Sequence, residues 1–215
     1  MSYEPTSEVV KEFWGYMASE YNFRAAHKAD AVEMRVVAWA LDLMGIQNKK
    51  RFLRSYATTI GRVVYLPFRI GVDSSGIGLE GQISTCVHEC VHVEQYRRGG
   101  ARFFWEYLTS PAARAHYEVD AYRSNMEMYF WATGGILDPR DLAENLADYG
   151  CSKADIRVAQ KNLEISARVV AKGGVVSGPT KKAIAWLEKH AGDAKKNVAF
   201  KPLRVGVLAQ DALGD

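Results

Sequence analysis

The chain has few cysteines, and their spacing does not suit a cysteine-based scaffold. Three occur in 215 residues, and none form a CxxC pair. Cys86 and Cys90 lie one helical turn apart, whereas Cys151 lies far along the chain. An odd count without paired spacing argues against a disulfide framework and against a cysteine-rich zinc knuckle. We interpret the three as buried apolar residues of a protein in a reducing compartment.

The sequence also lacks a long apolar run. No stretch approaches the roughly 18 uninterrupted apolar residues of a membrane span. The opening residues, MSYEPTSE, lack the basic and then apolar order of a secretory signal. The composition, 48% apolar and 25% charged, is that of an ordinary globular protein. These features predict a cytoplasmic protein with no membrane partner.

Neither sign of charge dominates, since the formal net charge is +3. The local exception is the segment 172–204, which contains eight Lys or Arg residues and two acidic residues, a net charge of 8 − 2 = +6. The lysines do not alternate with aromatic residues, as they would in a platform that stacks nucleic-acid bases. We therefore expect a solvated helical face and no nucleic-acid partner.

Glycine and proline divide the chain into segments that are mostly helical. Helices are predicted at about 7–21, 29–44, 82–98, 111–133, 139–149, 152–172 and 179–191. Between residues 55 and 72, β-branched and aromatic residues broken by Gly61 and Pro67 predict one or two strands. The predicted class is therefore α+β and mostly helical. A core at 1–137, with the small sheet packed on the helix at 82–98, is expected to carry an all-helical region at 138–215.

The feature that carries chemistry is the run His88-Glu89-Cys90-Val91-His92, inside a predicted helix. Four residues advance an α-helix by about 400°, so the two imidazoles project from one side about 6 Å apart and can bind one metal ion. Glu89 lies about 100° around the helix, where it can take a proton from a metal-activated water without being a ligand. Chance would produce this pattern in few sequences with five histidines, so we favour a functional site.

A third ligand is needed, and it is not a histidine six residues after His92, because Arg98 stands there. The helix predicted from Pro111 offers His116, Glu118 and Asp120. Glu118 is the charged member of an apolar stripe that also contains Ala115, Val119, Tyr122, Met126, Tyr129 and Phe130. A carboxylate on a core-facing surface needs a metal or an ion pair, so Glu118 is the favoured ligand. His116 and Asp120 stay as alternatives, as does a buried salt bridge from Glu118 to Arg24, Arg35 or Arg123.

These residues resemble the zincin superfamily, and within it the gluzincin pattern of HExxH followed at a distance by a helical glutamate. The chain is similar to small bacterial and phage-encoded zinc peptidases, in which HExxH-x-x-Gln precedes a Glu-x-x-Ala-Tyr-like run. Here the first motif ends at Gln95 and the second is Glu118 to Tyr122. The likeness covers about residues 58–129. It implies a zincin-like core, one Zn²⁺ per chain, and the strand region 60–68 beside the motif helix as a binding edge for extended substrate.

The larger gluzincins have a supporting aspartate four residues after the glutamate, and Tyr122 stands at that position here. Tyr122 is therefore a candidate to hydrogen-bond the oxyanion, in competition with core packing. Tyr96 and His116 are rival donors.

The resemblance implies a metallopeptidase that acts on a peptide or protein, with Glu89 as general base and His88, His92 and Glu118 as zinc ligands. The alternative, of another class, is a virion or injection-machine assembly protein. Its zincin core would bind zinc and dock a protein partner without cleaving it, and its location would be the virion. A third hypothesis is a toxin-like effector that cleaves one host protein.

Overall fold

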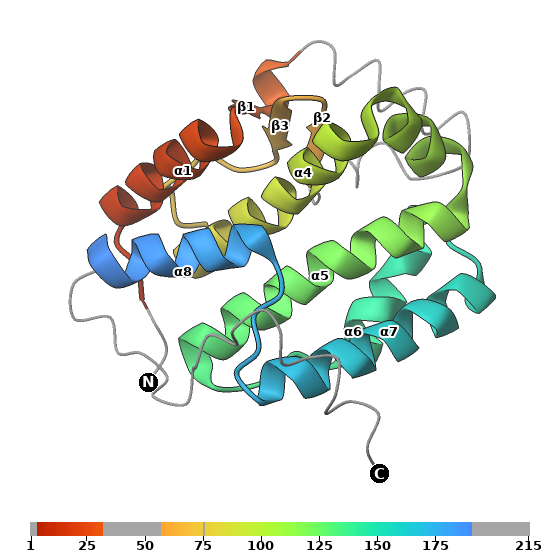
Figure 1. The fold of residues 1–215 in the computed structure, drawn as a ribbon. Coiled ribbons are helices and arrows are strands. Elements are labelled where there is room, and N and C mark those ends of the chain that lie inside the picture. Colours follow the sequence, from red (N-terminus) through yellow and green to blue (C-terminus); the bar gives the residue numbers. More distant parts are fainter. Residues whose placement is uncertain (1–3, 32–56, 75, 191–215) are drawn as a thin grey trace.

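The computed structural model describes residues 4–31, 57–74 and 76–190 of the protein (Figure 1). This part of the chain is mostly helical and contains one small sheet of three strands. The long helices are α1 (Ser7–Tyr21), α4 (Leu79–Thr109), α5 (Pro111–Thr133), α7 (Lys153–Ala171) and α8 (Gly178–His190). The short elements are β1 (Arg24–His27), η1 (Lys28–Asp30), β2 (Thr58–Ile60), β3 (Val63–Leu66), α6 (Pro139–Glu144) and η2 (Asn145–Tyr149). The predicted α+β, mostly helical class is confirmed.

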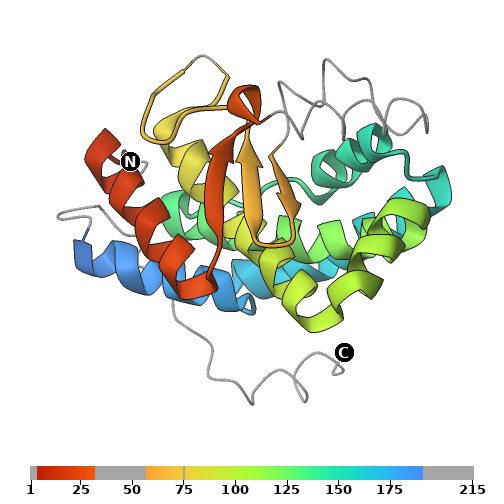
Figure 2. The same ribbon diagram turned by 90° about the horizontal axis from the view of Figure 1, so that it is seen from above.

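The sheet has the strand order β1-β3-β2, with β1 parallel and β2 antiparallel to β3. It lies on one side of the helices (Figure 2), and β2 contacts α4. The strands predicted between residues 55 and 72 are present as β2 and β3, which are joined through Gly61 at φ +62°. Strand β1 was not predicted, because its sequence, RAAH, has no β-branched or aromatic residue. The backbone hydrogen bonds to β3 stabilise the extended conformation of β1, which the local sequence does not favour.

Most helix boundaries follow the capping signals of the sequence. The Ser110 side chain caps the start of α5, which has Pro111 at its first turn and ends at the left-handed Gly134. Ser152 and Asp155 form the expected capping box at the start of α7. Part of the helix predicted at 29–44 lies outside the described residues, and its beginning is the short 3-10 helix η1.

Helix α4 differs from the prediction at both ends. It begins at Leu79 instead of residue 82 and continues to Thr109 past the predicted stop at Gly99-Gly100. Gly100 nevertheless leaves the helical conformation, with φ 54° and ψ −136°, so the axis breaks there. The stop signal was therefore placed correctly, but a second helical segment follows it directly.

The core consists of two clusters that share α5. The first joins α1, the sheet, α4 and α8, and it receives Met128, Trp131 and Ala132 from the end of α5. The second joins α5 to α6, η2 and α7. The predicted apolar stripe of α5 is largely buried, but Tyr129 is 37% exposed and was wrongly placed in it. Helix α5 therefore holds the two halves of the molecule together.

Helix α8 returns to the beginning of the chain. The Trp186 ring contacts the rings of Phe13 and Tyr16 on α1, at centroid distances of 5.6 and 5.8 Å. The division of the chain at residue 137 stays a prediction. Within the described ranges, no helix combines the length and the apolar character that crossing a bilayer requires.

Candidate metal centre

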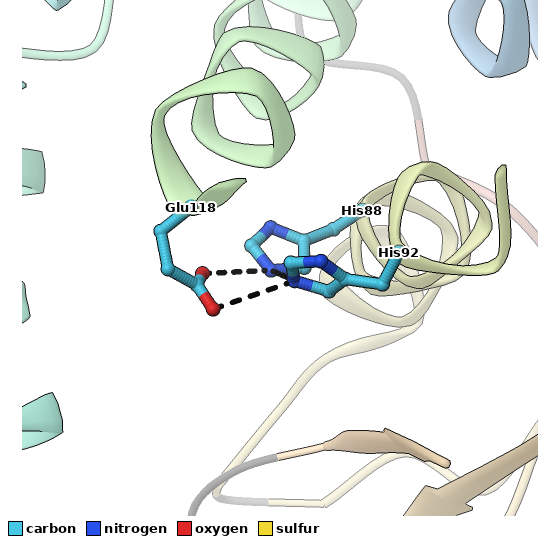
Figure 3. Close-up of side chains that lie close together, drawn as sticks. All are labelled: His88, His92 and Glu118. Atoms are coloured by element: carbon cyan, nitrogen blue, oxygen red, sulfur yellow. Dashed lines mark hydrogen bonds and ion pairs between the residues drawn. The ribbon is translucent and has the colours of Figure 1, made fainter. Parts of the chain in front are cut away.

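Helices α4 and α5 bring together the side chains of His88, His92 and Glu118 (Figure 3). One possible ligand atom from each residue lies within 4.8 Å of the other two. The two Nε2 atoms are 3.2 Å apart, and Glu118 Oε2 and Oε1 lie 3.5 and 3.4 Å from Nε2 of His88 and His92 respectively. The Glu118 side chain is 1% exposed. One nitrogen from each imidazole and one carboxylate thus face a common point, and the group could hold a metal ion.

The local sequence explains this convergence. His88 and His92 are four residues apart on α4 and therefore share a helix face. The turn at Ser110 folds α5 back along α4, and the apolar stripe of α5 brings Glu118 to that face. Of the rival ligands, His116 is exposed, and Asp120 accepts a hydrogen bond from Arg123 at 3.1 Å. Among the three candidates on α5, Glu118 is the one that joins the histidines.

Each imidazole is oriented by an amide side chain. His88 Nδ1 lies 2.8 Å from Asn125 Oδ1, and His92 Nδ1 lies 2.8 Å from Gln95 Oε1. The amides are themselves fixed, because Asn125 Nδ2 donates to the Ser84 carbonyl and hydroxyl oxygens, and Gln95 Nε2 donates to the Tyr117 carbonyl. An amide oxygen can only accept a hydrogen bond, so both imidazoles must donate from Nδ1. This arrangement leaves the Nε2 lone pairs directed at the common point.

This donor set fits a bound cation. Two Nε2 lone pairs and a buried carboxylate face one another, and Glu118 Oε2 has no hydrogen-bond partner. A buried carboxylate oxygen that accepts no hydrogen bond is costly unless a positive charge lies nearby. Two nitrogens and one oxygen within reach of one point match the ligand types and number of a zinc site that keeps one position open.

Without a metal, the positive charge beside Glu118 comes from a proton on His92. Burial lowers the pKa of His92, but the Glu118 carboxylate attracts the proton more strongly, and the pKa rises to about 9. Burial likewise raises the pKa of Glu118, yet the two imidazoles hold it well below its ordinary value. The carboxylate is therefore ionised at neutral pH and available as a ligand.

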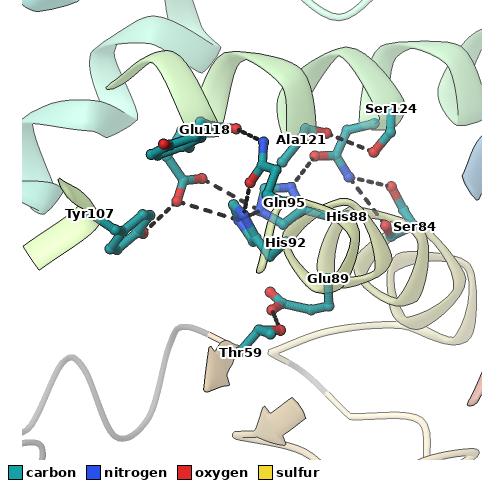
Figure 4. A network of polar contacts seen from close by, with 12 residues as sticks. Thr59, Ser84, His88, Glu89, His92, Gln95, Tyr107, Glu118, Ala121 and Ser124 are labelled. Carbon is teal, nitrogen blue, oxygen red and sulfur yellow. Dashed lines mark hydrogen bonds and ion pairs between the residues drawn. The ribbon is translucent and has the colours of Figure 1, made fainter. Parts of the chain in front are cut away.

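A tyrosine that the sequence analysis did not identify completes the surroundings of Glu118. The Tyr107 hydroxyl donates to Glu118 Oε1 at 2.5 Å (Figure 4). Arg114, which is 3% exposed, donates to the carbonyl oxygens of Tyr107 and Leu108 and to that of Tyr149. The guanidinium group therefore holds the end of α4 in place. Tyr107 lies beyond the kink at Gly100, so no helical spacing from His92 could have predicted it.

The other predicted residues lie around this centre. Glu89 is 4% exposed, and its Oε2 accepts a hydrogen bond from the Thr59 hydroxyl at 2.6 Å. The Tyr122 ring is buried, with its centroid 5.6 Å from that of His88. The rival Tyr96 lies elsewhere, under the β2–β3 turn, where a Cβ added at Gly61 would be 3.8 Å from its ring. Tyr122 is therefore beside His88, and its role in catalysis stays a prediction.

Comparison with protein-family models, curated proteins and solved structures finds no match. The likeness to zincins therefore stays a prediction from the motif residues. Cys86 and Cys90 are free and buried in the first core cluster, as predicted, whereas Cys151 is free but only partly buried. None of the three belongs to the group that could hold a metal.

Proposed function

We propose that the protein is a zinc-dependent peptidase with a zincin-like core. The observation that carries the proposal is the group of His88, His92 and Glu118, of which His92 and Glu118 are buried, with both Nε2 lone pairs turned toward one point. Two imidazoles and a carboxylate favour Zn²⁺ over Mg²⁺ and Ca²⁺, which prefer oxygen ligands. Three protein ligands would leave a position for water or substrate.

A zinc ion bound there would lower the pKa of a water molecule to about 7 and polarise the scissile carbonyl. Glu89 follows His88 directly and is the acid or base nearest in sequence to the ligands. Its carboxylate would accept a proton from the attacking water and pass it to the leaving amine. Tyr122, whose ring lies beside His88, would stabilise the oxyanion. The predicted binding edge at 60–68 is wrong for β3, which is the central strand of the sheet. An extended peptide would instead pair with β2, an edge strand among the described strands.

The ligand set is tested by elemental analysis of the purified protein. We expect about one zinc per chain in the wild type and its loss in H88A and E118A, because each removes one of three ligands. H116A and D120A are matched controls from the same helix, and we expect both to keep the metal. Zinc retained in E118A and lost in either control would overturn the assignment of the third ligand.

The chemistry is tested separately in E89Q. We expect this variant to bind zinc like the wild type and to hydrolyse a peptide library about 10² to 10⁴ times more slowly, the usual contribution of a general base. E94Q changes a glutamate on the same helix, paired with the exposed Arg98, and should keep full activity. Undiminished hydrolysis by zinc-loaded E89Q would exclude Glu89 as the base.

A second candidate is an assembly protein whose metal centre only supports the fold. It is favoured by Trp105, which is 62% exposed on α4, next to Phe104 at 36%. Exposed aromatic residues of this kind are typical of protein interfaces. Bound zinc with no hydrolysis above that of E89Q, across the whole library, would favour this function over the peptidase.

A further inference from the structure

The Glu89 carboxylate is held from the sheet. The Thr59 hydroxyl donates to its Oε2 at 2.6 Å, and in Figure 4 the two side chains face each other from α4 and β2. Strand β2 is an edge strand among the described strands, because the order is β1-β3-β2. A hydrogen bond to a charged carboxylate is among the stronger ones in proteins. One of the two Glu89 oxygens is therefore engaged by an element that carries no metal ligand.

A buried lysine supports the same strand. Lys28 lies in η1, directly after β1, and is 3% exposed. Its Nζ donates to the Thr58 hydroxyl at 2.8 Å, one residue before Thr59. The two bonds connect β1 and η1 to β2, and β2 to the motif helix.

A lysine at this buried position destabilises the fold if its side chain only fills space. Burying an ammonium group is unfavourable, whereas a methionine would fill a similar volume without that penalty. Burial lowers the pKa of Lys28 to about 7, and the Glu89 carboxylate acts in the opposite direction. Lys28 is thus electrostatically linked to the residue that the Thr59 hydroxyl holds.

We propose that Thr59 and Lys28 are positioning residues for Glu89. Thr59 fixes Oε2 directly, and Lys28 fixes Thr59 by holding β2 through Thr58. The other carboxylate oxygen, Oε1, is then the one that exchanges the proton. This inference rests on the proposed function of Glu89 as general base.

The direct bond is tested in zinc-loaded T59V and T59S. Valine keeps the shape of the side chain and removes the hydroxyl, whereas serine keeps the hydroxyl. We expect kcat in T59V to be about ten- to a hundredfold lower with KM within about twofold, and T59S to recover most of the loss. Equal kcat in T59V and the wild type would overturn the role of Thr59.

Crystal structures of zinc-loaded wild type and T59V give a readout that needs no turnover. We expect the Glu89 carboxylate to contact Thr59 in the wild type and to take another rotamer in T59V. An unmoved carboxylate in T59V would refute the positioning role even if peptides are cleaved. A displaced carboxylate in a protein that cleaves nothing would instead support the positioning role and reject the proposed peptidase.

The indirect step is tested by K28M, T58V and the double variant. If Lys28 acts through Thr58, each single change should lower kcat by a similar factor, and the double variant should lose little more than either. K161M, at an exposed lysine of α7, is the control and should match the wild type. Independent, multiplying losses in the double variant would show that Lys28 does not act through Thr58.

Discussion

At the scale of single residues, the centre depends on side chains that do not touch the common point. Asn125 and Gln95 each accept a hydrogen bond from an imidazole Nδ1 and are themselves held by α4 and α5. Such partners fix the tautomer of a metal-binding histidine and the direction of its ring. The site is therefore shaped before any metal arrives.

We expect N125L to weaken zinc binding about 10- to 100-fold, because the leucine cannot accept the His88 proton and leaves the ring free to turn. Competition with a chromophoric chelator measures the affinity. N162L is the control, since Asn162 is exposed on α7. An N125L affinity equal to that of the wild type would mean that Asn125 does not orient His88.

The sequence was informative where the site follows helical spacing. His88 and His92 share a face by their separation of four, and Glu118 was distinguished from His116 and Asp120 by the apolar stripe around it. Asn125 could have been found in the same way, because it follows Glu118 by two helical turns, 125 − 118 = 7 residues.

Tyr107, Thr59 and Lys28 could not be found in this way. Tyr107 reaches Glu118 across the kink at Gly100, and Lys28 reaches Thr58 between segments 30 residues apart. Contacts of this kind depend on tertiary packing, which leaves no period in the sequence.

At the scale of elements, the decisive feature is the break in α4. Gly100 has φ 54° and ψ −136°, a conformation that is open to glycine and unfavourable for residues with a Cβ. The break lets the end of α4 turn so that Tyr107 contacts Glu118. A straight helix would carry this tyrosine away from the site.

We expect G100A to destabilise the protein by about 1–3 kcal/mol, because alanine is strained in this conformation. G15A is the matched control on α1, where an added Cβ meets no atom within 4 Å. It should stabilise the fold by about 0.5–1 kcal/mol, since alanine is favoured within a helix. Urea unfolding gives both values, and a G100A variant as stable as the wild type would contradict the strain at this position.

At the scale of the whole molecule, the ionisation of His92 and Glu118 makes stability depend on pH. The folded protein holds a proton on His92 with a pKa of about 9, above the ordinary 6.5. This contribution is complete below about pH 6.5 and disappears as the pH rises through about 9. Glu118, with its lowered pKa, contributes in the opposite sense and loses its contribution in acid.

We therefore expect the metal-free protein to lose about 3 kcal/mol of stability between pH 6.5 and pH 9.5, an order-of-magnitude value from the His92 shift. Unfolding by urea across this range measures the loss. H116Q should show the same loss, because His116 is exposed. A zinc-loaded sample should not show it, since the metal replaces the proton. A flat profile for the metal-free protein would mean that His92 is not charged there.

The candidate metal centre and the sheet differ in how far apart in the sequence their parts lie. The three side chains of the candidate centre, those of His88, His92 and Glu118, come from two helices that follow each other directly. The sheet instead pairs Arg24 with Val63. Closing a short loop costs less chain entropy than closing a long one. We expect the α4–α5 hairpin to bring these three side chains together first, and β2, which holds Glu89, to pack against α4 later in folding.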